Sequence, residues 1–539
     1  MDYDALIVGF GPVGATMANL LACCGLRVAV IEAEACIYDR PRAITFDHEV
    51  MRIFQFCGLA SHIAPYTAPR GPTHFLGVDG GVIRKLDPMP PPYPLAWPPT
   101  LSFVQPEVER VLREGVTAHA SADVYLQHQA LEFAQDEEGV SLSVLDLERD
   151  RGGGQRILRG RVLLGCDGAN SFVRRAMGVM QDDLEFDECW MVVDARITRP
   201  VELPPHGIQY CWPSRPSTFV PGPGNLRRWE IKLLPGEDPK AFGSPDNVSR
   251  QIARFADPGC FEIWRSAVYR FHALLAREWR QGNVFLLGDA CHQTPPFLGQ
   301  GLCAGIRDAA NLAWKLAMVL RDGASPALLD SYAAERKPHV RSTVATAKAL
   351  GVVIGELDAE AALRRDATLR AQLVSGEMET IRQRLIPNLE HGVIDSDVAA
   401  RGAGTLFVQP RVRRVSVTGD TAPGEPLMLD DVLPFRFLIV TASAQALTWL
   451  AAESLAAWRR LHGESVLICP CGASPNAPPD GVRHFEEAGT LFADWMAQMP
   501  CAAAVIRPDR YVFGTAANAD ELNRLVMAVA AQVFTLGAA

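Results

Sequence analysis

The sequence predicts an α/β fold, in which a Rossmann-type dinucleotide-binding domain is interleaved with a mixed-sheet domain and followed by a separate α/β domain. The chain opens with a buried strand, a glycine-rich turn and a helix at 4–25, as a Rossmann unit does. Strand-like alternation dominates 139–147, 156–164 and 186–234. Short strands alternate with helices beyond about residue 426, and the 539-residue chain is longer than one core usually holds.

The N-terminal unit carries the first chemical motif. A buried strand at 4–9, a helix at 12–25 and a second buried strand at 27–32 form a βαβ unit. The turn between strand and helix has the sequence Gly9-Phe-Gly11-Pro-Val-Gly14, and Glu32 ends the second strand. This context matches the dinucleotide fingerprint.

Each residue of this motif has an expected task. Gly9 permits the tight turn, Gly11 lets the backbone approach a pyrophosphate, and Gly14 lets helix and strand pack closely. The positive end of the helix stabilises phosphate charge. Glu32 can accept hydrogen bonds from a ribose.

Two further motifs follow buried strands. Asp167-Gly168 precedes a helix that Ser171 could cap. Gly288-Asp289 opens a loop rich in proline and glycine that leads into a helical pattern at 302–321. The Asp289 carboxylate can hold sugar hydroxyls, and the backbone amides that open the helix can face an anionic group. We expect the nearby His292 to be structural rather than a catalytic base.

The remaining segments suggest irregular and helical parts. The proline-dense stretch 87–99 predicts an irregular loop or lid. Residues 326–394 are mainly helical in pattern, and a glycine-rich composition shift predicts a linker at 396–425. Residues 426–539 then form the separate C-terminal domain.

Composition excludes several classes of function. The net charge is 52 − 62 = −10, which argues against nucleic acid as a partner. The N-terminus lacks a signal-type segment, and the apolar runs are shorter than the ~20 residues that span a membrane. Thirteen scattered cysteines predict reduced thiols and a cytoplasmic location. No pattern predicts a metal site.

The three motifs, in this order and spacing, resemble those of the class A flavoprotein aromatic hydroxylases, the para-hydroxybenzoate hydroxylase superfamily. The subgroup with the strongest resemblance is 3-(3-hydroxyphenyl)propionate hydroxylase. Many relatives carry Asn at the position of Cys303 and Ala at that of Cys291. Cys303 can still offer its backbone amide to a flavin. Other segments that carry the resemblance are 40–44, 103–108, 309–316, 406–410 and 507–510.

The resemblance implies a domain plan. An FAD-binding domain would occupy about 1–75, 100–180 and 280–330, interleaved with a substrate-binding sheet domain at about 76–99 and 181–279. A helical segment at 331–395 would complete the body of the protein. The C-terminal domain would be thioredoxin-like without redox cysteines. Such a domain is linked with oligomerisation, which makes a homodimer the candidate assembly.

The resemblance also implies a reaction. NAD(P)H would reduce FAD, and the reduced flavin with O2 would give a C4a-hydroperoxide that hydroxylates a phenolic ring. The expected substrate is 3-(3-hydroxyphenyl)propionate or a related phenolic acid of aromatic catabolism. The chain has no second glycine-rich dinucleotide turn, so NAD(P)H would bind only transiently.

Site residues follow from the motifs and the resemblance. Asp47 is the candidate for proton transfer to or from the phenol, or for orienting it, with His48 as runner-up. A helix-capping role for Asp47 is an equally good alternative. The candidate FAD-binding residues are Gly9, Gly11, Gly14, Glu32, Arg42, Gln105, Asp167, Gly288, Asp289, Pro296, Gly299, Gly301, Leu302 and Cys303.

Three residues are candidates for the roof of the substrate pocket, namely Tyr210, Trp212 and Arg215. Arg215 could pair with a substrate carboxylate, and a surface salt bridge is the alternative.

Two other functions stay open at this point. A polyketide-tailoring hydroxylase would use the same cofactor on a larger polycyclic substrate. Trp190, Trp212 and Trp229 suggest a filled pocket and therefore favour a single ring. A non-catalytic flavoprotein-fold binding module is the second alternative, and the intact motifs argue against it.

Overall fold

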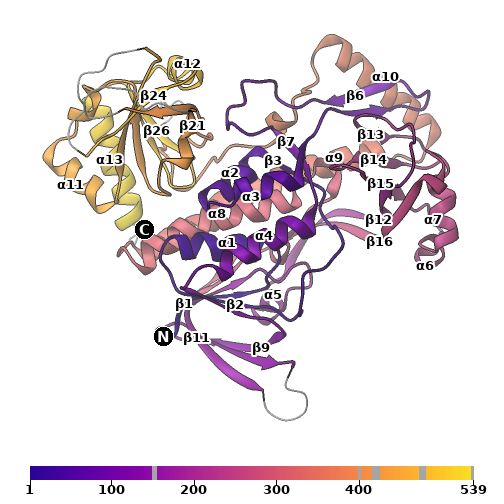
Figure 1. Cartoon of the computed structure of the whole chain (residues 1–539), viewed down its shortest axis with the longest axis horizontal. Helices are drawn as coiled ribbons and strands as arrows, with labels where there is room; N and C mark the ends of the chain where they lie inside the picture. The colour runs from indigo at the N-terminus through magenta and orange to yellow at the C-terminus, as the bar shows by residue number, and fades with distance from the viewer. Residues whose placement is uncertain (149–153, 398–401, 416–424, 473–480, 536–539) are drawn as a thin grey trace.

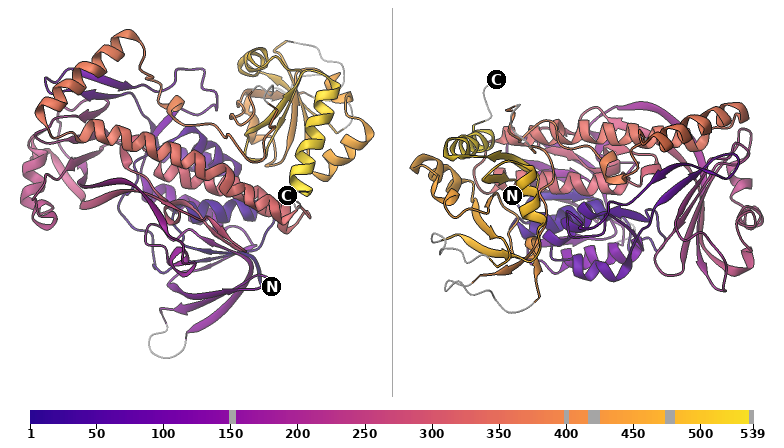
Figure 2. Two further views of the ribbon diagram at one scale, coloured as in Figure 1. Left: turned by 180° about the vertical axis from the view of Figure 1, so that it is seen from behind. Right: turned by 90° about the horizontal axis from the view of Figure 1, so that it is seen from above.

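The computed structural model describes residues 1–148, 154–397, 402–415, 425–472 and 481–535. The C-terminal domain lies at one end of the molecule and a second sheet at the other, with the dinucleotide-binding part between them (Figure 1). Two long helices, α8 (Gly301–Leu320) and α9 (Asp330–Gly355), run between the two ends (Figure 2). Within the described residues, no helix is long and apolar enough to cross a membrane.

The first sheet is the predicted Rossmann unit. Strand β1 (Tyr3–Val8) lies between β2 (Val28–Ile31) and β11 (Gln155–Gly165), and all three are parallel. Both faces of β1 and β2 are covered, which explains their continuous apolar sequences. The sheet order is β17-β18-β11-β1-β2-β8, and the hairpin β9–β10 extends β11.

Helices cover this sheet and complete the predicted unit. Helix α1 (Pro12–Cys23) packs directly against α8 and α4 (Gln105–Thr117). The other elements of this part are β8 (Ala122–Tyr125), β9 (His128–Gln135), β10 (Val140–Asp146), α5 (Phe172–Ala176), β17 (Arg280–Gln281) and β18 (Val284–Leu286). The strands predicted at 139–147 and 156–164 are confirmed as β10 and β11.

The second sheet has the order β19-β16-β12-β15-β14-β13-β5-β6. It is mixed, because β13 pairs with β5 in parallel and the other neighbours are antiparallel. Its strands are β5 (Thr73–Leu76), β6 (Val82–Leu86), β12 (Gln181–Ile197), β13 (Gly207–Tyr210), β14 (Ser217–Pro221), β15 (Leu226–Lys232), β16 (Phe261–Ala276) and β19 (His292–Gln293).

The two faces of the second sheet differ in character. The outer face presents Ile208, Tyr210, Phe219, Trp229 and Ile231, which pack against the helices α6 (Pro239–Phe242) and α7 (Pro245–Ile252). The inner face follows from the strand register and presents the alternate residues, which are mostly polar. Its polar members are Thr73, Gln209, Thr218, Arg228 and Glu230.

The inner face looks toward the segment that follows the Rossmann βαβ unit. Arg228 donates hydrogen bonds to the carbonyls of Arg42 at 2.8 Å and Pro41 at 3.3 Å. That segment continues into β3 (Thr45–Asp47), which pairs with β7 (Thr100–Phe103), and into α2 (His48–Phe56). The short elements α3 (Ala60–Ile63) and β4 (Thr67–Pro69) complete this region.

The proline-dense stretch 87–99 is largely irregular, as predicted, and it is anchored at several points. Met89 N donates to Gln383 at 3.1 Å, and Trp97 donates to Gln55 at 3.0 Å. Gln409 donates to the Leu95 carbonyl at 2.8 Å. Residues after α9 form α10 (Ala359–Ser375), which packs on β6.

The C-terminal sheet has the order β21-β20-β24-β23-β22-β25-β26. In it, β22, β23 and β24 are parallel, whereas β25 and β26 are antiparallel. This order fits the thioredoxin-like interpretation. The elements are β20 (Arg411–Arg414), β21 (Leu427–Met428), β22 (Leu438–Thr441), α11 (Ala452–Arg460), β23 (Glu464–Cys469), β24 (Arg483–Glu487), α12 (Leu491–Gln498), β25 (Ala503–Ile506), β26 (Val512–Ala516) and α13 (Ala519–Phe534).

One predicted boundary needs correction. Strand β20 lies inside the range 396–425 that composition predicts as a linker, yet it pairs with β24 in the C-terminal sheet. The glycine content of the flanking turns masked a short strand whose partner lies some 70 residues later in the chain. Residues 398–401 and 416–424 of that range lie outside the described residues.

A buried ionic cluster joins the C-terminal domain to the rest of the protein. Arg507 donates to Glu335 on α9 at 2.7 Å and to Asp509 at 2.7 Å. Lys315 on α8 lies 3.0 Å from Glu335, and Trp314 donates to Asp509 at 3.1 Å. Burial alone would raise the pKa of Glu335, but the charges of Arg507 and Lys315 outweigh it and lower the pKa to about 2.

We expect Arg507→Met to lower the free energy of unfolding by about 3–5 kcal/mol, because it leaves the buried Asp509 carboxylate without its cation. Denaturant titration of the holoprotein measures this change. The exposed pair Arg110–Glu114 is the control, and Arg110→Gln should cost less than about 1 kcal/mol. Equal effects of the two substitutions would contradict a locking role for the cluster.

Candidate active site

The glycine turn has the geometry that its sequence predicts. Gly9 has a φ of +100°, and a Cβ there would lie 2.5 Å from the Cys166 carbonyl oxygen. A Cβ on Gly14 would lie 2.0 Å from the Gly9 carbonyl oxygen, so this glycine sets the close approach of helix and strand. A Cβ on Gly11 would meet nothing within 4 Å. Gly11 therefore faces open space, as a residue that adjoins a pyrophosphate must.

Two groups beside the turn are suited to the adenosine half of a dinucleotide. Helix α1 has Gly11 as its N-cap and no side chain that caps its first amides. Its positive end is thus free to bind phosphate. Glu32 accepts hydrogen bonds from Phe10 N at 2.8 Å and Glu34 N at 3.0 Å. A carboxylate has about four acceptor positions, so capacity remains for ribose hydroxyls.

The Gly288-Asp289 motif lies against the same turn. Gly288 has a φ of +61°, and a Cβ there would lie 3.0 Å from Val13 on α1. The Asp289 side chain is exposed to solvent and makes no hydrogen bond to another described residue. Protein atoms nevertheless surround it at longer range, and this burial raises the pKa of its carboxyl. A carboxylate held in a recess without partners is suited to sugar hydroxyl donors.

Arg42 and Gln105 shape the approach to Asp289. The Gln105 side-chain oxygen accepts from the backbone amides of Arg42 at 2.9 Å and Ala43 at 2.6 Å. The exposed Arg42 guanidinium lies 5.1 Å from the Tyr38 ring centroid, and its charge acts on Asp289. Gln105 thus holds the loop, and Arg42 offers a cation to phosphate oxygens.

The Asp167-Gly168 motif is hydrogen-bonded within itself and to the loop of the third motif. Ser171 is the N-cap of α5, as predicted, and accepts from Arg174 N at 2.9 Å. Asp167 accepts from Ser171 at 2.5 Å and from Val173 N at 3.0 Å. The Arg174 side chain donates to the Ala290 carbonyl at 2.9 Å. The motif therefore fixes the loop that carries Asp289.

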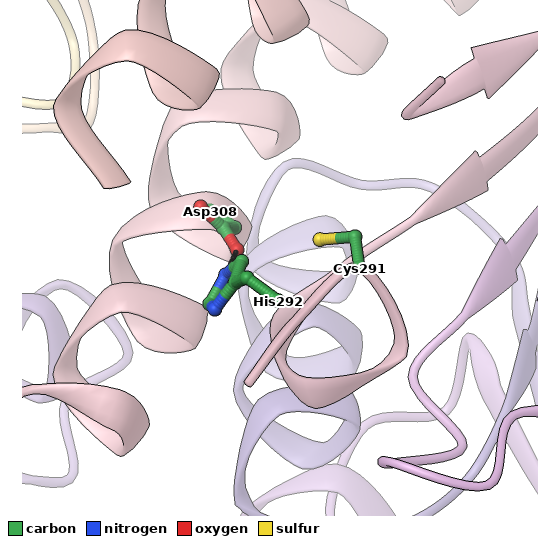
Figure 3. Close-up of side chains that lie close together, drawn as sticks. All are labelled: Cys291, His292 and Asp308. Carbon is green, nitrogen blue, oxygen red and sulfur yellow. Dashed lines mark hydrogen bonds and ion pairs between the residues drawn. The ribbon is translucent and has the colours of Figure 1, made fainter. Parts of the chain in front are cut away.

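His292 is a buried member of a structural cluster (Figure 3). Its Nε2 lies 2.7 Å from Asp308 Oδ2, which also accepts from Gly288 N at 3.1 Å. The other Asp308 oxygen accepts from Arg336 at 2.9 Å. The Cys291 thiol lies close by, and burial raises its pKa well above its usual value. Because Arg336 already neutralises Asp308, we assign the cluster to holding the Gly288 turn.

Helix α8 begins in the glycine-rich loop of the third motif. Pro296 opens a short 3₁₀ turn, and Gly299 has a φ of +68°. Gln300 is the N-cap of α8, and no side chain caps the first amides of the helix. Those amides belong to Gly301, Leu302 and Cys303. The Cys303 thiol contacts the Gly299 carbonyl at 3.5 Å.

Asp47 is the N-cap of α2, which confirms the capping alternative, since its Oδ1 accepts from Val50 N at 3.2 Å. Its Oδ2 accepts from Gln300 at 3.1 Å and forms an ion pair with Arg307. Burial on its own would raise the pKa of Asp47, but the Arg307 charge outweighs it and the pKa is lowered. His48 is buried with an unpartnered Nδ1, and burial lowers its pKa to about 4.

The predicted roof residues lie away from the cofactor motifs. Tyr210 belongs to the outer face of the second sheet, and Trp212 packs with it and donates to the Gly77 carbonyl at 3.0 Å. Arg215 pairs with Glu237 through contacts of 2.6 and 2.7 Å, and this ion pair is largely buried rather than the surface salt bridge of the alternative interpretation. Trp229 also faces outward, whereas Trp190 contacts Phe297, with ring centroids 5.2 Å apart.

The sequence did not lead us to predict the polar inner face of the second sheet. Gln209 lies between the outward-facing Ile208 and Tyr210, so strand alternation alone could have identified it. Its side-chain oxygen accepts from Thr218 at 2.5 Å. Arg70 and Arg382 both reach Thr73 on the same face, and no local pattern in the sequence marks either arginine.

The structure separates the tasks of the motif residues and thereby predicts the effect of three substitutions. Gly11→Ala and Asp289→Ala should fold normally but lose FAD, because one crowds the phosphate and the other removes the acceptor for sugar hydroxyls. Gly14→Ala should destabilise the fold itself, because its Cβ would collide with Gly9. Flavin absorbance per protein and the melting temperature distinguish the two effects. Full FAD occupancy in Asp289→Ala would contradict the role of the third motif.

Comparisons with known proteins agree with this arrangement. Residues 2–347 match the FAD binding domain family, and residues 404–532 match the HcaD C-terminal domain family. The chain is 33% identical to the 3-(3-hydroxy-phenyl)propionate/3-hydroxycinnamic acid hydroxylase of Paraburkholderia xenovorans (strain LB400), over 95% of this chain and 88% of that protein. It is also 33% identical to a probable NADH-specific resorcinol 4-hydroxylase of Rhodococcus jostii (strain RHA1), over 98% and 95% of the two chains.

Solved structures show the same fold. The flavin-dependent monooxygenase PieE, in complex with FAD and substrate, aligns with a TM-score of 0.78 at 19% identity over 98% of this chain and 99% of that chain. Aklavinone-11 hydroxylase, in a ternary complex with FAD and aklavinone, aligns with a TM-score of 0.73 at 21% identity over 98% of each chain. With an FAD-binding family model that covers well over half of its length, the chain belongs to the FAD binding domain family, and FAD is its cofactor.

Proposed function

We propose that the protein is an FAD- and NAD(P)H-dependent monooxygenase that hydroxylates a single-ring phenolic acid such as 3-(3-hydroxyphenyl)propionate. One observation carries the proposal. Curated relatives of 30–33% identity match along almost the whole chain, and they are named as hydroxylases of 3-(3-hydroxyphenyl)propionate or of resorcinol. The glycine turn at 9–14 and the uncapped starts of α1 and α8 support the same proposal.

Different residues of the chain are suited to different parts of the cofactor and the substrate. FAD, when bound, would supply the redox chemistry that links oxidation of the nicotinamide to insertion of oxygen into the ring. The end of α1 and Arg42 hold the phosphates, and Asp289 holds the sugar hydroxyls. The amides that open α8 stabilise negative charge at the ring end of the site. The inner face of the second sheet covers the substrate and helps to exclude water.

Expectations about the nicotinamide donor and the cellular compartment also belong to this proposal. NAD(P)H binds transiently, because the sequence has no second glycine-rich dinucleotide turn. The name of the Rhodococcus relative makes NADH the first donor to test. All thirteen cysteines are free thiols, which suits a reducing compartment such as the cytoplasm.

We propose that Asp47 acts by position rather than as a base. Its oxygens are engaged by Val50, Gln300 and Arg307, and its lowered pKa makes it a weak proton acceptor. It therefore fixes the N-terminus of α8 beside the flavin. His48 remains the runner-up for a hydrogen bond to the phenol, since its Nδ1 lacks a partner, but burial lowers its pKa to about 4, so it is a weak proton acceptor as well.

Asp47→Asn should retain FAD but lower the fraction of NAD(P)H that yields hydroxylated product, by roughly tenfold or more, because the ring and the flavin lose their alignment. Arg307 keeps Glu49 as a partner, so the substitution leaves no unpaired buried cation. Product and hydrogen peroxide per NAD(P)H measure the coupling, with the exposed Asp136→Asn as control. Unchanged coupling with a lower melting temperature would assign Asp47 to capping alone.

The function itself is tested by incubating the purified yellow holoenzyme with NADH or NADPH and a panel of phenols. A single-ring phenolic acid should accelerate NAD(P)H oxidation and gain one oxygen atom, as seen by mass spectrometry. A response only to polycyclic phenols would favour a polyketide-tailoring enzyme. Protein that binds FAD but shows no phenol-stimulated oxidation would indicate a binding module and refute the proposal.

A further inference from the structure

Two buried arginines lie between the second sheet and the glycine-rich loop at 294–300 that leads into α8, which we call the flavin loop. Arg70 is 9% exposed and Arg382 is 6% exposed. Arg70 follows β4, whereas Arg382 belongs to the segment after α10. They come from parts of the chain more than 300 residues apart, and both reach the hydroxyl of Thr73 on the inner face.

The hydrogen bonds of Arg70 and Arg382 do not neutralise the positive charges of the two side chains. Arg70 donates to Thr73 at 3.2 Å, and its buried Nε has no partner. Arg382 donates to Thr73 at 3.0 Å and to the Leu298 carbonyl at 3.1 Å. All of these acceptors are neutral. Two like charges therefore converge on one neutral oxygen, and neither arginine has an ion pair with an acid of the described residues.

The acids within electrostatic reach are committed elsewhere. Glu230 faces Arg70 from the inner face, but it lies 4.0 Å from Arg228, and burial raises the pKa of its carboxyl. Asp47 acts on Arg382 from a distance and is paired with Arg307. Burial and the mutual repulsion of the pair lower the pKa of Arg70 to about 9. The guanidinium stays charged at neutral pH, so its desolvation cost is not offset by the protein.

Most other buried arginines of the described residues have an acid partner, whereas Arg174 has none and donates instead to the Ala290 and Ala169 carbonyls at 2.9 and 2.8 Å. Arg228, Arg307 and Arg507 each lie within 2.7 Å of a carboxylate. A buried guanidinium without an acid partner is unfavourable unless a bound anion completes it. The carbonyl that holds Arg382 belongs to Leu298, directly before Gly299 in the loop that leads to α8. The missing anion therefore belongs beside the flavin and under the substrate sheet.

We propose that Arg70, Arg382 and the Thr73 hydroxyl form the anion subsite that binds the carboxylate of the aromatic substrate. This assignment rests on the proposed function and gives a basis for its substrate specificity. The subsite selects phenols with a carboxylate-bearing side chain over neutral phenols. Two guanidinium groups offer paired N–H donors to the two oxygens of one carboxylate. Binding at this end also orients the ring toward the α8 loop.

The test compares 3-(3-hydroxyphenyl)propionate with its methyl ester, which lacks the negative charge and carries one added methyl group. Dissociation constants are measured on the FAD-loaded enzyme, from the change in flavin absorbance on titration. The wild type should bind the acid more tightly than the ester. Arg70→Met and Arg382→Met should each reduce this preference by roughly 30-fold or more, with little change for the ester.

A matched control is the buried Arg215, which lies on the outer side of the same sheet and already has Glu237 as partner. Arg215→Met should keep the preference for the acid. Loss of the preference in Arg215→Met, with retention in the other two variants, would overturn the proposal and move the carboxylate to Arg215. Retention in all variants would overturn it as well.

Melting temperatures and the flavin reduction potential distinguish a carboxylate subsite from other roles of the two arginines. Without ligand, Arg70→Met and Arg382→Met should melt no lower than the wild type, because methionine removes an uncompensated buried charge. The acid should raise the melting temperature of the wild type but not of these variants. If the variants keep the acid preference but shift the flavin reduction potential, the pair serves the reduced cofactor and the proposal is wrong.

The outcomes separate this proposal from the proposed function. Failure of the wild type to hydroxylate any phenolic acid would contradict the proposed function. Hydroxylation of the acid, together with an unchanged acid preference in both arginine variants, would leave the function standing and remove only the subsite. Arg70→Lys and Arg382→Lys retain the charge without the paired donors, and they should keep part of the preference.

Discussion

Arg307 joins the start of α8 to the segment that contains β3 and α2. It is a fully buried cation on the second turn of α8, and it contacts Asp47, Glu49 and Gln300. Asp47 and Glu49 belong to the segment after the Rossmann βαβ unit, and Gln300 begins α8. A buried cation with this many partners is favourable only when all of them are in place. The ion pairs therefore determine where α8 starts relative to β3 and α2.

The same network reaches the C-terminal domain. Glu49 accepts a hydrogen bond from Tyr511 at 2.9 Å. Nearby, Asp430 is held by Arg52 at 2.5 Å and by Arg510 at 2.7 Å. The C-terminal domain thus contacts Glu49, one of the two carboxylates that pair with Arg307 near the start of α8. Its place in the molecule is set by buried charges as well as by the apolar contacts of α8 with its sheet.

The second sheet uses its two faces for different purposes. The outer face is apolar and packs on α6 and α7, which stabilises the fold. The inner face is polar and looks toward the flavin loop, where a phenolic substrate needs hydrogen bonds and counter-charge. Most buried arginines on that side have acids as partners, and Arg70 and Arg382 do not. The difference between satisfied and unsatisfied charge is what separates structural from ligand-binding roles there.

The sequence by itself determined the fold class and the backbone geometry of the glycine motifs. Gly9, Gly14 and Gly288 act through local backbone geometry, and the strand and helix periods around them are local as well, so short motifs predicted them correctly. The predicted linker failed because β20 is defined by pairing with a distant strand. Only the tertiary structure decided which face of the second sheet looks toward the loop before α8, and it placed Tyr210 and Arg215 on the other one. It alone brought Arg70 and Arg382 together, because the pairing of buried charges depends on strand register and helix packing across the whole chain.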